Sequence, residues 1–316
     1  ISACLVGSEM CIRDRLYLVA YQYAKAGAKA GVKVAAVLDT ARFADQLAAL
    51  PGMLTQPAVL AKGMYYVGWL RAHGVAVHIG VRSLRVEGDT RANAVVWSDG
   101  QTEHTVPCDA VGFGYALRSE TQLADLLGCR FAWAPTHRAH LPERDGAGRT
   151  SVAGVYLAGD GAGIMGADAA EWAGERAGLA LLADHGVKVD TARAAELERK
   201  LTGLMPFRQG LERAFPFPTD WATHAPDALV VCRCENITAG ELRACAHDAG
   251  ADEMNRLKAL TRVGMGRCQG RMCGVAAAEI LAHATGKPID TVGRLRGQAP
   301  IKPIPIHLQA QAEAAE

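Results

Sequence analysis

The order of apolar and polar positions along the chain predicts an α/β fold. Residues 16–31 carry apolar side chains at helical spacing and end in glycine, and residues 32–39 form a continuous apolar run of strand length. A helix followed by a buried strand is the second half of a βαβ unit. Asp39 ends this strand, where a Rossmann unit places an acidic residue that accepts hydrogen bonds from ribose hydroxyls. A solvated strand end is the alternative interpretation of Asp39.

The region before this helix shows neither a recognisable first strand nor a G-x-G-x-x-G loop, and only Gly7 lies nearby. Dinucleotide binding by this unit is therefore left open. The first fifteen residues, ISACLVGSEMCIRDR, have no signal-peptide pattern and differ in character from the rest of the chain. We expect residues 1–15 to be foreign to the protein, with its true N-terminal portion lost.

The next stretch predicts a helix and then a meander of short strands. Residues 61–74 suit a helix, and strands are expected at 75–80, 83–89 and 93–99, with turns at the Gly88-Asp89 and Asp99-Gly100 dipeptides. A further strand from Asp109 leads through a glycine-rich turn into a helix.

A second motif combines a strand, an acid, a glycine loop and a helix. Residues 154–160 (GVYLAGD) read as a buried strand that ends in Asp160, and a helix should run from after Asp168 to about Leu182. Asp168 with Glu171 is expected to cap the start of that helix. Another helix, from Thr191, is expected to form a linker before the prolines at 216 and 218.

Four cysteines form the strongest chemical pattern: a C-x-C pair and a C-x4-C pair that 33 residues separate, namely Cys232, Cys234, Cys268 and Cys273. Four thiolates suffice for a [2Fe-2S] cluster, whereas a structural zinc site usually shows C-x2-C spacing. We therefore favour the cluster and keep zinc as the alternative. Five basic residues in the same segments would lower the cost of adding an electron: Arg233, Lys258, Arg262, Arg267 and Arg271.

Helix signals frame these cysteines. Thr238 and Glu241 form a capping box, so a helix should follow the first pair and end near Gly250. A second helix is expected over 252–262 and a third from near Cys273. Three glycines between them would let the backbone wrap closely around sulfide: Gly264, Gly266 and Gly270.

The segment from Leu229 to Arg296 resembles the bacterioferritin-associated ferredoxin-like [2Fe-2S] domain. The resemblance is carried by CRCE at 232–235 and by N-x-LK-x-x-TR-x-GMG-x-CQGR-x-CG at 255–274. The C-x4-C spacing is similar to the variant at the C-terminus of FAD-dependent dehydrogenase α subunits, the type found in opine oxidase, D-hydroxyproline dehydrogenase, heteromeric proline dehydrogenases and hydrogen cyanide synthase. This implies the four cysteines as cluster ligands.

The resemblance extends to residues 154–164, which are similar to the second FAD fingerprint. It implies that Asp160 binds the flavin ribitol and that the backbone of Gly159 and Gly161 approaches the cofactor. Residues on the return crossover would also pass the flavin: Gly112, Gly114 and Tyr115.

The implied architecture is a two-dinucleotide-domain flavoprotein with an added small α-helical [2Fe-2S] domain. We expect a partial NAD(P)-type domain at 16–110, half of an FAD domain at 111–185, a helical linker at 186–226, the cluster domain at 227–298 and an extended tail at 299–316.

Composition narrows the function. The net charge of +1 over 316 residues gives no reason to expect nucleic acid or a membrane surface as a partner, and no apolar run is long enough to span a bilayer. Nine cysteines, four of them in a metal pattern, do not suit a secreted disulfide scaffold, so we expect a cytoplasmic protein.

The leading hypothesis is an electron-transfer subunit of a heteromeric amino- or imino-acid dehydrogenase with FAD and a [2Fe-2S] cluster, while NAD(P) stays open. Its expected partners are a second, substrate-oxidising flavoprotein subunit and a small ferredoxin-like subunit. The alternatives are a self-contained NAD(P)H-dependent reductase and a non-enzymatic module that carries a cluster or zinc. No catalytic residue can be named from the sequence.

Overall fold

The computed structural model describes residues 2–7, 15–114 and 117–301. The chain folds into two compact units, and each is built from several segments. The first unit comprises Ile1–Ser119, Gly146–Gly148 and Ala158–Pro218, and the second comprises Glu120–Asp145, Arg149–Leu157 and Thr219–Glu316. In the described part of the chain, none of the helices has the length and apolar character needed to cross a membrane.

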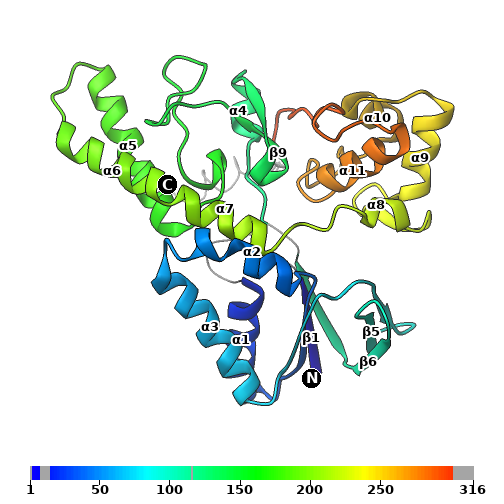
Figure 1. Ribbon diagram of the computed structural model, residues 1–316. Coiled ribbons are helices and arrows are strands. Elements are labelled where there is room, and N and C mark those ends of the chain that lie inside the picture. The colour runs from blue at the N-terminus through cyan, green and yellow to red at the C-terminus, as the bar shows by residue number, and fades with distance from the viewer. Residues whose placement is uncertain (1, 8–14, 115–116, 302–316) are drawn as a thin grey trace, which may run out of the picture. The chain divides into compact units, whose positions relative to one another are not determined.

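A four-stranded parallel sheet is the centre of the first unit (Figure 1). Its strands run in the order β3 (Ala76–Ile79), β2 (Lys33–Asp39), β1 (Ser2–Gly7) and β7 (Ala110–Gly114). The predicted helix and strand are present as α1 (Arg15–Gly27), extended by the 3₁₀ turn η1 (Ala28–Ala30), and β2. The chain also forms the first strand of the βαβ unit, which no sequence pattern indicated. The boundary predicted between residues 110 and 111 falls inside β7.

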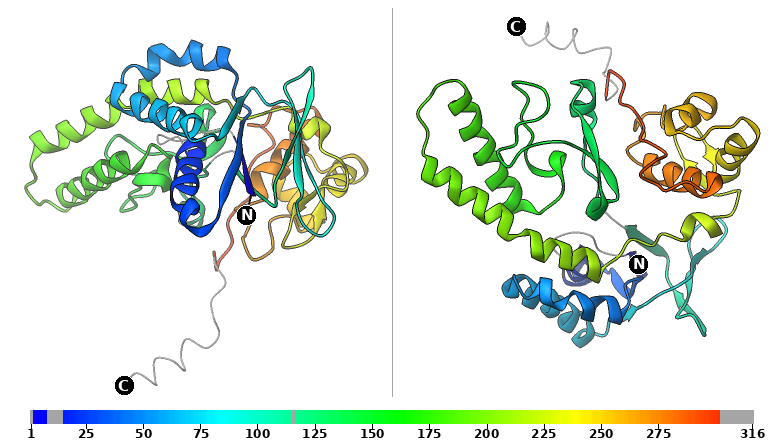
Figure 2. Two further views of the ribbon diagram at one scale, coloured as in Figure 1. Left: turned by 90° about the horizontal axis from the view of Figure 1, so that it is seen from below. Right: turned by 45° about the horizontal axis from the view of Figure 1, so that its top comes forward.

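The two faces of the sheet are covered differently. Along β2, Val34 and Val37 face a core with α1, α2 (Phe43–Met53) and α3 (Pro57–Ala72), while Ala36 and Leu38 face a small antiparallel sheet (Figure 2). Val34 and Val37 share a face because the pairing of β2 with β1 skips one residue between Val34 and Ala36. The small antiparallel sheet is a meander of β4 (Leu84–Glu87), β5 (Ala94–Ser98) and β6 (Glu103–Pro107). The predicted meander was wrong in its first strand, at residue 75, because the meander begins only with β4. β3 instead joins the parallel sheet, because its backbone pairs with β2.

The remaining helices of the first unit are α5 (Ala167–Asp184), α6 (Thr191–Gly203) and α7 (Met205–Ala214). Helix α7 packs closely on α2, where the backbones of Gly52 and Gly210 touch and leave no room for a side chain. The region predicted as a linker is thus part of the core, since Phe207 and Leu211 are buried with the residues of α1 to α3.

The strand predicted at 154–160 does not form. The stretch has one isolated bridge, at Tyr156, and then enters the 3₁₀ turn η3 (Gly159–Ala162). Gly154 and Gly159 have φ of +77° and +61°, which a continuous strand cannot accommodate. Asp160 is accordingly exposed rather than at the end of a buried strand. Asp168 lies in the first turn of α5. The N-cap is Gly166, so the helix start has no side-chain capping hydrogen bond.

The second unit combines a hairpin segment with the cysteine domain. The first part holds α4 (Gln122–Leu126), β8 (Phe131–Ala134), η2 (Pro135–His137) and β9 (Ala139–Pro142). The second holds α8 (Trp221–His224), β10 (Val230–Cys232), β11 (Ile237–Thr238), α9 (Ala239–Asp248), α10 (Met254–Thr261) and α11 (Gly274–Thr285). Leucine, isoleucine and methionine side chains from α9, α10 and α11 form the core of this unit.

The helix signals around the cysteines are confirmed. The Thr238 hydroxyl accepts the Glu241 N–H at 3.3 Å, and the Glu241 carboxylate accepts the Thr238 N–H at 2.7 Å. Helix α9 therefore begins directly after β11, as the capping box predicts. Helix α10 ends at Thr261, its C-cap Arg262 has a left-handed φ of 66°, and α11 begins after Cys273.

Candidate functional site

The four cysteines of the predicted cluster lie on two short turns. Cys232 ends β10 and Cys234 lies in the turn before β11, while Cys268 lies between α10 and α11 and Cys273 is the N-cap of α11. Cys232 and Cys273 are each 1% exposed, Cys268 is half-buried and Cys234 is exposed. Cys232 and Cys273 thus lie on the buried side of the turns, and Cys234 lies on the side open to solvent.

The two turns approach each other closely enough for their thiols to interact in pairs. Burial, together with the neighbouring Cys232 and Cys268, raises the pKa of Cys273 to about 12. Burial also acts to raise the pKa of Cys268, but backbone N–H groups of Met272 and Gly270, together with the Cys234 thiol, lower it below the ordinary value. Backbone donors directed at a sulfur favour its thiolate, which is the form that binds metal.

Glycine is required where the turns meet. A Cβ atom on Gly266 would overlap the Cβ of Cys234, so a larger residue would push the first cysteine turn away. Gly264 and Gly270 have φ of +80° and +81°, and a Cβ on either would lie 2.7 Å from Cδ1 of Leu295. The sequence predicted that the backbone of these three glycines wraps around sulfide; the structure shows them close to Leu295 and Cys234, and the approach to sulfide stays a prediction.

The backbone of this region is also conformationally unusual. Among the described residues, four non-glycine residues have positive φ, and three of them border the cysteine turns: Asn236, Arg262 and Gln269. Such conformations cost free energy and cluster at functional sites.

The thiols do not form a complete coordination set. Across residues 2–7, 15–114 and 117–301, no three His, Cys, Asp or Glu side chains have an arrangement that could hold a metal ion. The soft donor set and the backbone N–H groups at Cys268 suit an iron–sulfur cluster, but the structure leaves the four sulfurs in interacting pairs. Coordination by these cysteines remains a prediction.

Three of the five basic residues near the cysteines have partners within the fold. Lys258 is buried and donates to the carbonyl of Arg296 at 3.2 Å, and Arg262 binds the Glu235 carboxylate at 2.9 Å. Arg271 binds the Glu120 carboxylate and the Ile301 carbonyl. Arg233 and Arg267 are exposed. Lys258, Arg262 and Arg271 therefore stabilise the fold around the cysteines and also add positive charge near them.

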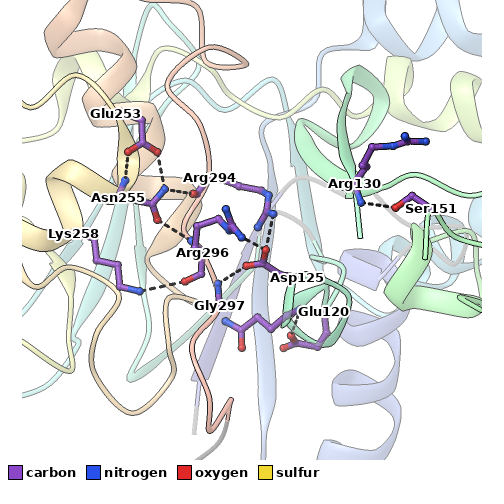
Figure 3. A network of polar contacts seen from close by, with 11 residues as sticks. Glu120, Asp125, Arg130, Ser151, Glu253, Asn255, Lys258, Arg294, Arg296 and Gly297 are labelled. Atoms are coloured by element: carbon purple, nitrogen blue, oxygen red, sulfur yellow. Dashed lines mark hydrogen bonds and ion pairs between the residues drawn. The ribbon is translucent and has the colours of Figure 1, made fainter. Parts of the chain in front are cut away.

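Residues of α4 contact the second cysteine turn and the segment 294–297, and none of them was predicted. Gln122 donates from Nε2 to the carbonyl of Gln269 at 2.7 Å, next to Cys268. Asp125, 6% exposed, accepts from Arg294 at 2.7 Å, from Arg296 at 3.0 Å and from the N–H of Gly297 (Figure 3). Because 147 positions separate Gln122 from Gln269, no local pattern could have revealed the contact.

The predicted flavin residues lie in the first unit. Gly159, Asp160 and Gly161 form the 3₁₀ turn before α5, and Gly159 packs so tightly on Ala170 that an added Cβ would lie 3.3 Å from its Cβ. The Asp160 carboxylate is exposed and has no hydrogen-bond or ion-pair partner in the described part of the chain. Gly112 and Gly114 are exposed on β7, and Tyr115 lies outside the described residues.

The parallel sheet brings two of the predicted residues to one edge. Gly7 of β1 pairs with Asp39 on one side and with Gly114 on the other, so all three lie where the strands end. The carboxyl ends of parallel strands are where open α/β sheets bind ligands. The Asp39 carboxylate is nevertheless fully buried, and it accepts from the Tyr17 hydroxyl at 2.6 Å and from the Ala41 N–H at 2.8 Å.

Comparison with known proteins adds three findings. Residues 230–313 match the sarcosine oxidase A3 domain family. The A subunit of opine oxidase from Agrobacterium tumefaciens (strain Ach5) is 38% identical over 300 residues, which cover 92% of this chain and 58% of that protein. Hydrogen cyanide synthase subunit HcnB of Pseudomonas aeruginosa is 31% identical over 290 residues, which cover 87% of this chain and 61% of that protein.

Among solved structures, L-proline dehydrogenase from P. horikoshii is similar in fold. The TM-score is 0.61 at 20% sequence identity, over 78% of this chain and 47% of that one. The chain spans less than two thirds of the length of each of these relatives. Their names agree with the predicted enzyme class, an oxidoreductase subunit.

Proposed function

We propose that this chain is part of the FAD- and iron–sulfur-containing subunit of a heteromeric dehydrogenase for amino or imino acids, including opines. In this function it passes electrons from a substrate-oxidising flavoprotein subunit towards an acceptor. The arrangement of the two cysteine turns carries the proposal. The similarity to the A subunit of opine oxidase supports the substrate class.

The proposed ligands are Cys232, Cys234, Cys268 and Cys273. When bound, a [2Fe-2S] cluster accepts and releases one electron at a time, and FAD takes up electrons in pairs. The chain would bury two of the thiolates, direct backbone N–H groups at Cys268, and exclude water on the side of Cys232 and Cys273. Backbone donors to cluster sulfurs raise the reduction potential, because they stabilise the added negative charge.

For the flavin, the proposed contacts are the Asp160 carboxylate to the ribitol and the backbone of Gly159 and Gly161. Asp160 suits this role because it is exposed and unpaired in the described structure. The buried, doubly hydrogen-bonded Asp39 does not suit ribose recognition, which weighs against a self-contained NAD(P)H-dependent reductase. A small ferredoxin-like subunit is a further proposed partner.

Metal and sulfide analysis tests the proposal. Protein purified without oxygen should contain two irons and two acid-labile sulfides per chain and show a paramagnetic signal after reduction. Cys234→Ser should remove most of the iron, whereas Cys245→Ala, a half-buried cysteine of α9 outside the turns, should retain it. Stoichiometric zinc without sulfide would instead support the alternative of a non-enzymatic module that carries zinc.

A further inference from the structure

Helices α1 and α3 of the first unit lie side by side and share one face to solvent (Figure 1). On α3 the residues of this face follow helical spacing of 3, 4 and 4, and on α1 two residues follow a spacing of 4. We call this surface the aromatic–basic face, and it consists of Tyr21, Lys25, Lys62, Tyr65, Trp69 and His73.

The rings of this face are held in place by one another. Tyr21 meets Trp69 edge-on with centroids 4.8 Å apart, and it meets Tyr65 at 6.1 Å. His73 stacks on Trp69 at 3.7 Å, and Lys25 donates to the Tyr21 hydroxyl at 2.9 Å. Tyr65 is 56% exposed, while Tyr21 and Trp69 are partly buried against the core of the first unit, so the cluster is anchored in the core and open to solvent at Tyr65. Ordered rings lose little conformational entropy when a partner covers them.

The charge of this face has one sign. The sequence has no Asp or Glu from residue 16 to 38 or from residue 46 to 86, a span that includes all of α3 and nearly all of α1. Three exposed cations on or beside the face form no ion pair within the part of the chain described: Lys25, Lys29 and Lys62. A face that offers aromatic rings and unpaired cations is complementary to an acidic surface.

We infer that the aromatic–basic face binds an acidic surface of the substrate-oxidising flavoprotein subunit. This inference rests on the proposed function, in which such a partner exists. Tyrosine and tryptophan are the residues that dominate binding energy at protein interfaces. The rings pack on one another instead of presenting free faces for stacked bases, and the face has no aliphatic side chains to insert into a bilayer. A protein partner fits these features better than a nucleic acid or a membrane.

The test is co-expression with the substrate-oxidising flavoprotein subunit, followed by affinity measurement between the separated subunits. Tyr65→Ala should raise the dissociation constant at least tenfold, because it removes an exposed ring of the face. Lys62→Glu should weaken binding at low salt, and raising the ionic strength should reduce that difference. Val86→Ala and Arg91→Glu, which change an exposed apolar and an exposed basic residue of the meander region, should leave the affinity unchanged.

Circular dichroism should show that all four variants retain the wild-type fold, since each side chain is exposed. A complex that tolerates both Tyr65→Ala and Lys62→Glu would overturn the interface while leaving the proposed function intact. Wild-type protein that carries the cluster but does not bind the flavoprotein would likewise overturn it. Binding to phosphatidylglycerol vesicles or to single-stranded DNA that only the two face variants lose would assign the face to another class of partner.

Discussion

At the scale of single residues, Asp125 shows how one buried charge fixes a long-range arrangement. Its two oxygens receive two guanidinium groups and one backbone N–H from residues 294–297. The Arg294 guanidinium also lies over the Phe131 ring, 3.6 Å from its centroid. The C-terminal side of the cysteine domain is thereby tied to α4 and β8, within the second unit.

Asp125→Asn should destabilise the second unit by about 3 kcal/mol, because it leaves two arginines without their buried counter-charge. Thermal unfolding monitored by circular dichroism would measure the loss. Asp252→Asn is the matched control in the same unit, since its ion pair with Lys287 is exposed, and its unfolding temperature should stay close to that of the wild type.

The same carboxylate predicts a pH dependence. Burial acts to raise the pKa of Asp125, but the hydrogen bond from Arg294 and the nearby cations lower it below its ordinary value. A carboxyl with a lowered pKa in the folded state stabilises the fold above its unfolded pKa, about 4, and this stabilisation is lost as the pH falls through the folded value. The stability difference between wild type and Asp125→Asn should therefore be full at pH 7 and shrink below about pH 4. An equal difference in acid and at neutral pH would contradict this account.

At the scale of elements, the two cysteine turns depend on the helices that flank them. The capping box positions the start of α9 after Cys234. The chain changes direction at Asn236, Arg262 and Gln269, whose backbones have the left-handed conformation. The second turn can approach the first only because Gly266 has no side chain. Helix ends and glycine positions thus determine where the sulfurs lie.

Gly266→Ala should separate the two turns, since its Cβ would overlap the Cβ of Cys234. We expect a loss of about 1–3 kcal/mol of stability from overpacking and a clear fall in iron per chain. Gly178→Ala in α5 is the control, because its Cβ would meet open space and alanine favours a helix. Normal iron content in Gly266→Ala would show that the turns need not approach as closely as the structure has them.

At the scale of the whole molecule, two compact units with separate cores share one chain. Most of residues 120–157 belong to the second unit. The chain then returns to the first unit, where it forms α5, α6 and α7, before it enters the cysteine domain. The second unit therefore cannot be separated from the first at a single boundary.

Calorimetry should resolve two unfolding transitions, one for each unit. Leu70→Ala, in the buried core of α3, should lower the stability measured from one transition by about 2–5 kcal/mol, and Asp125→Asn should lower the other. If both variants shifted a single common transition, the two units would unfold together as one cooperative body.

The sequence alone determined the local features: the helices around the cysteines, the capping box and the β2 strand. Each depends on neighbouring residues, because helix caps and apolar periodicity act within a few positions. It also provided the four-thiol pattern and the oxidoreductase class, with which the relatives agree.

Only the tertiary structure decided which distant segments meet. It placed β3 in the parallel sheet instead of the meander, exposed Asp160 in a turn, and buried Asp39 between Tyr17 and Ala41. It also brought Gln122 and Asp125 to partners 147 and 169 positions away. These outcomes depend on backbone pairing and on the satisfaction of buried charges across the fold, which leave no signal in local sequence pattern.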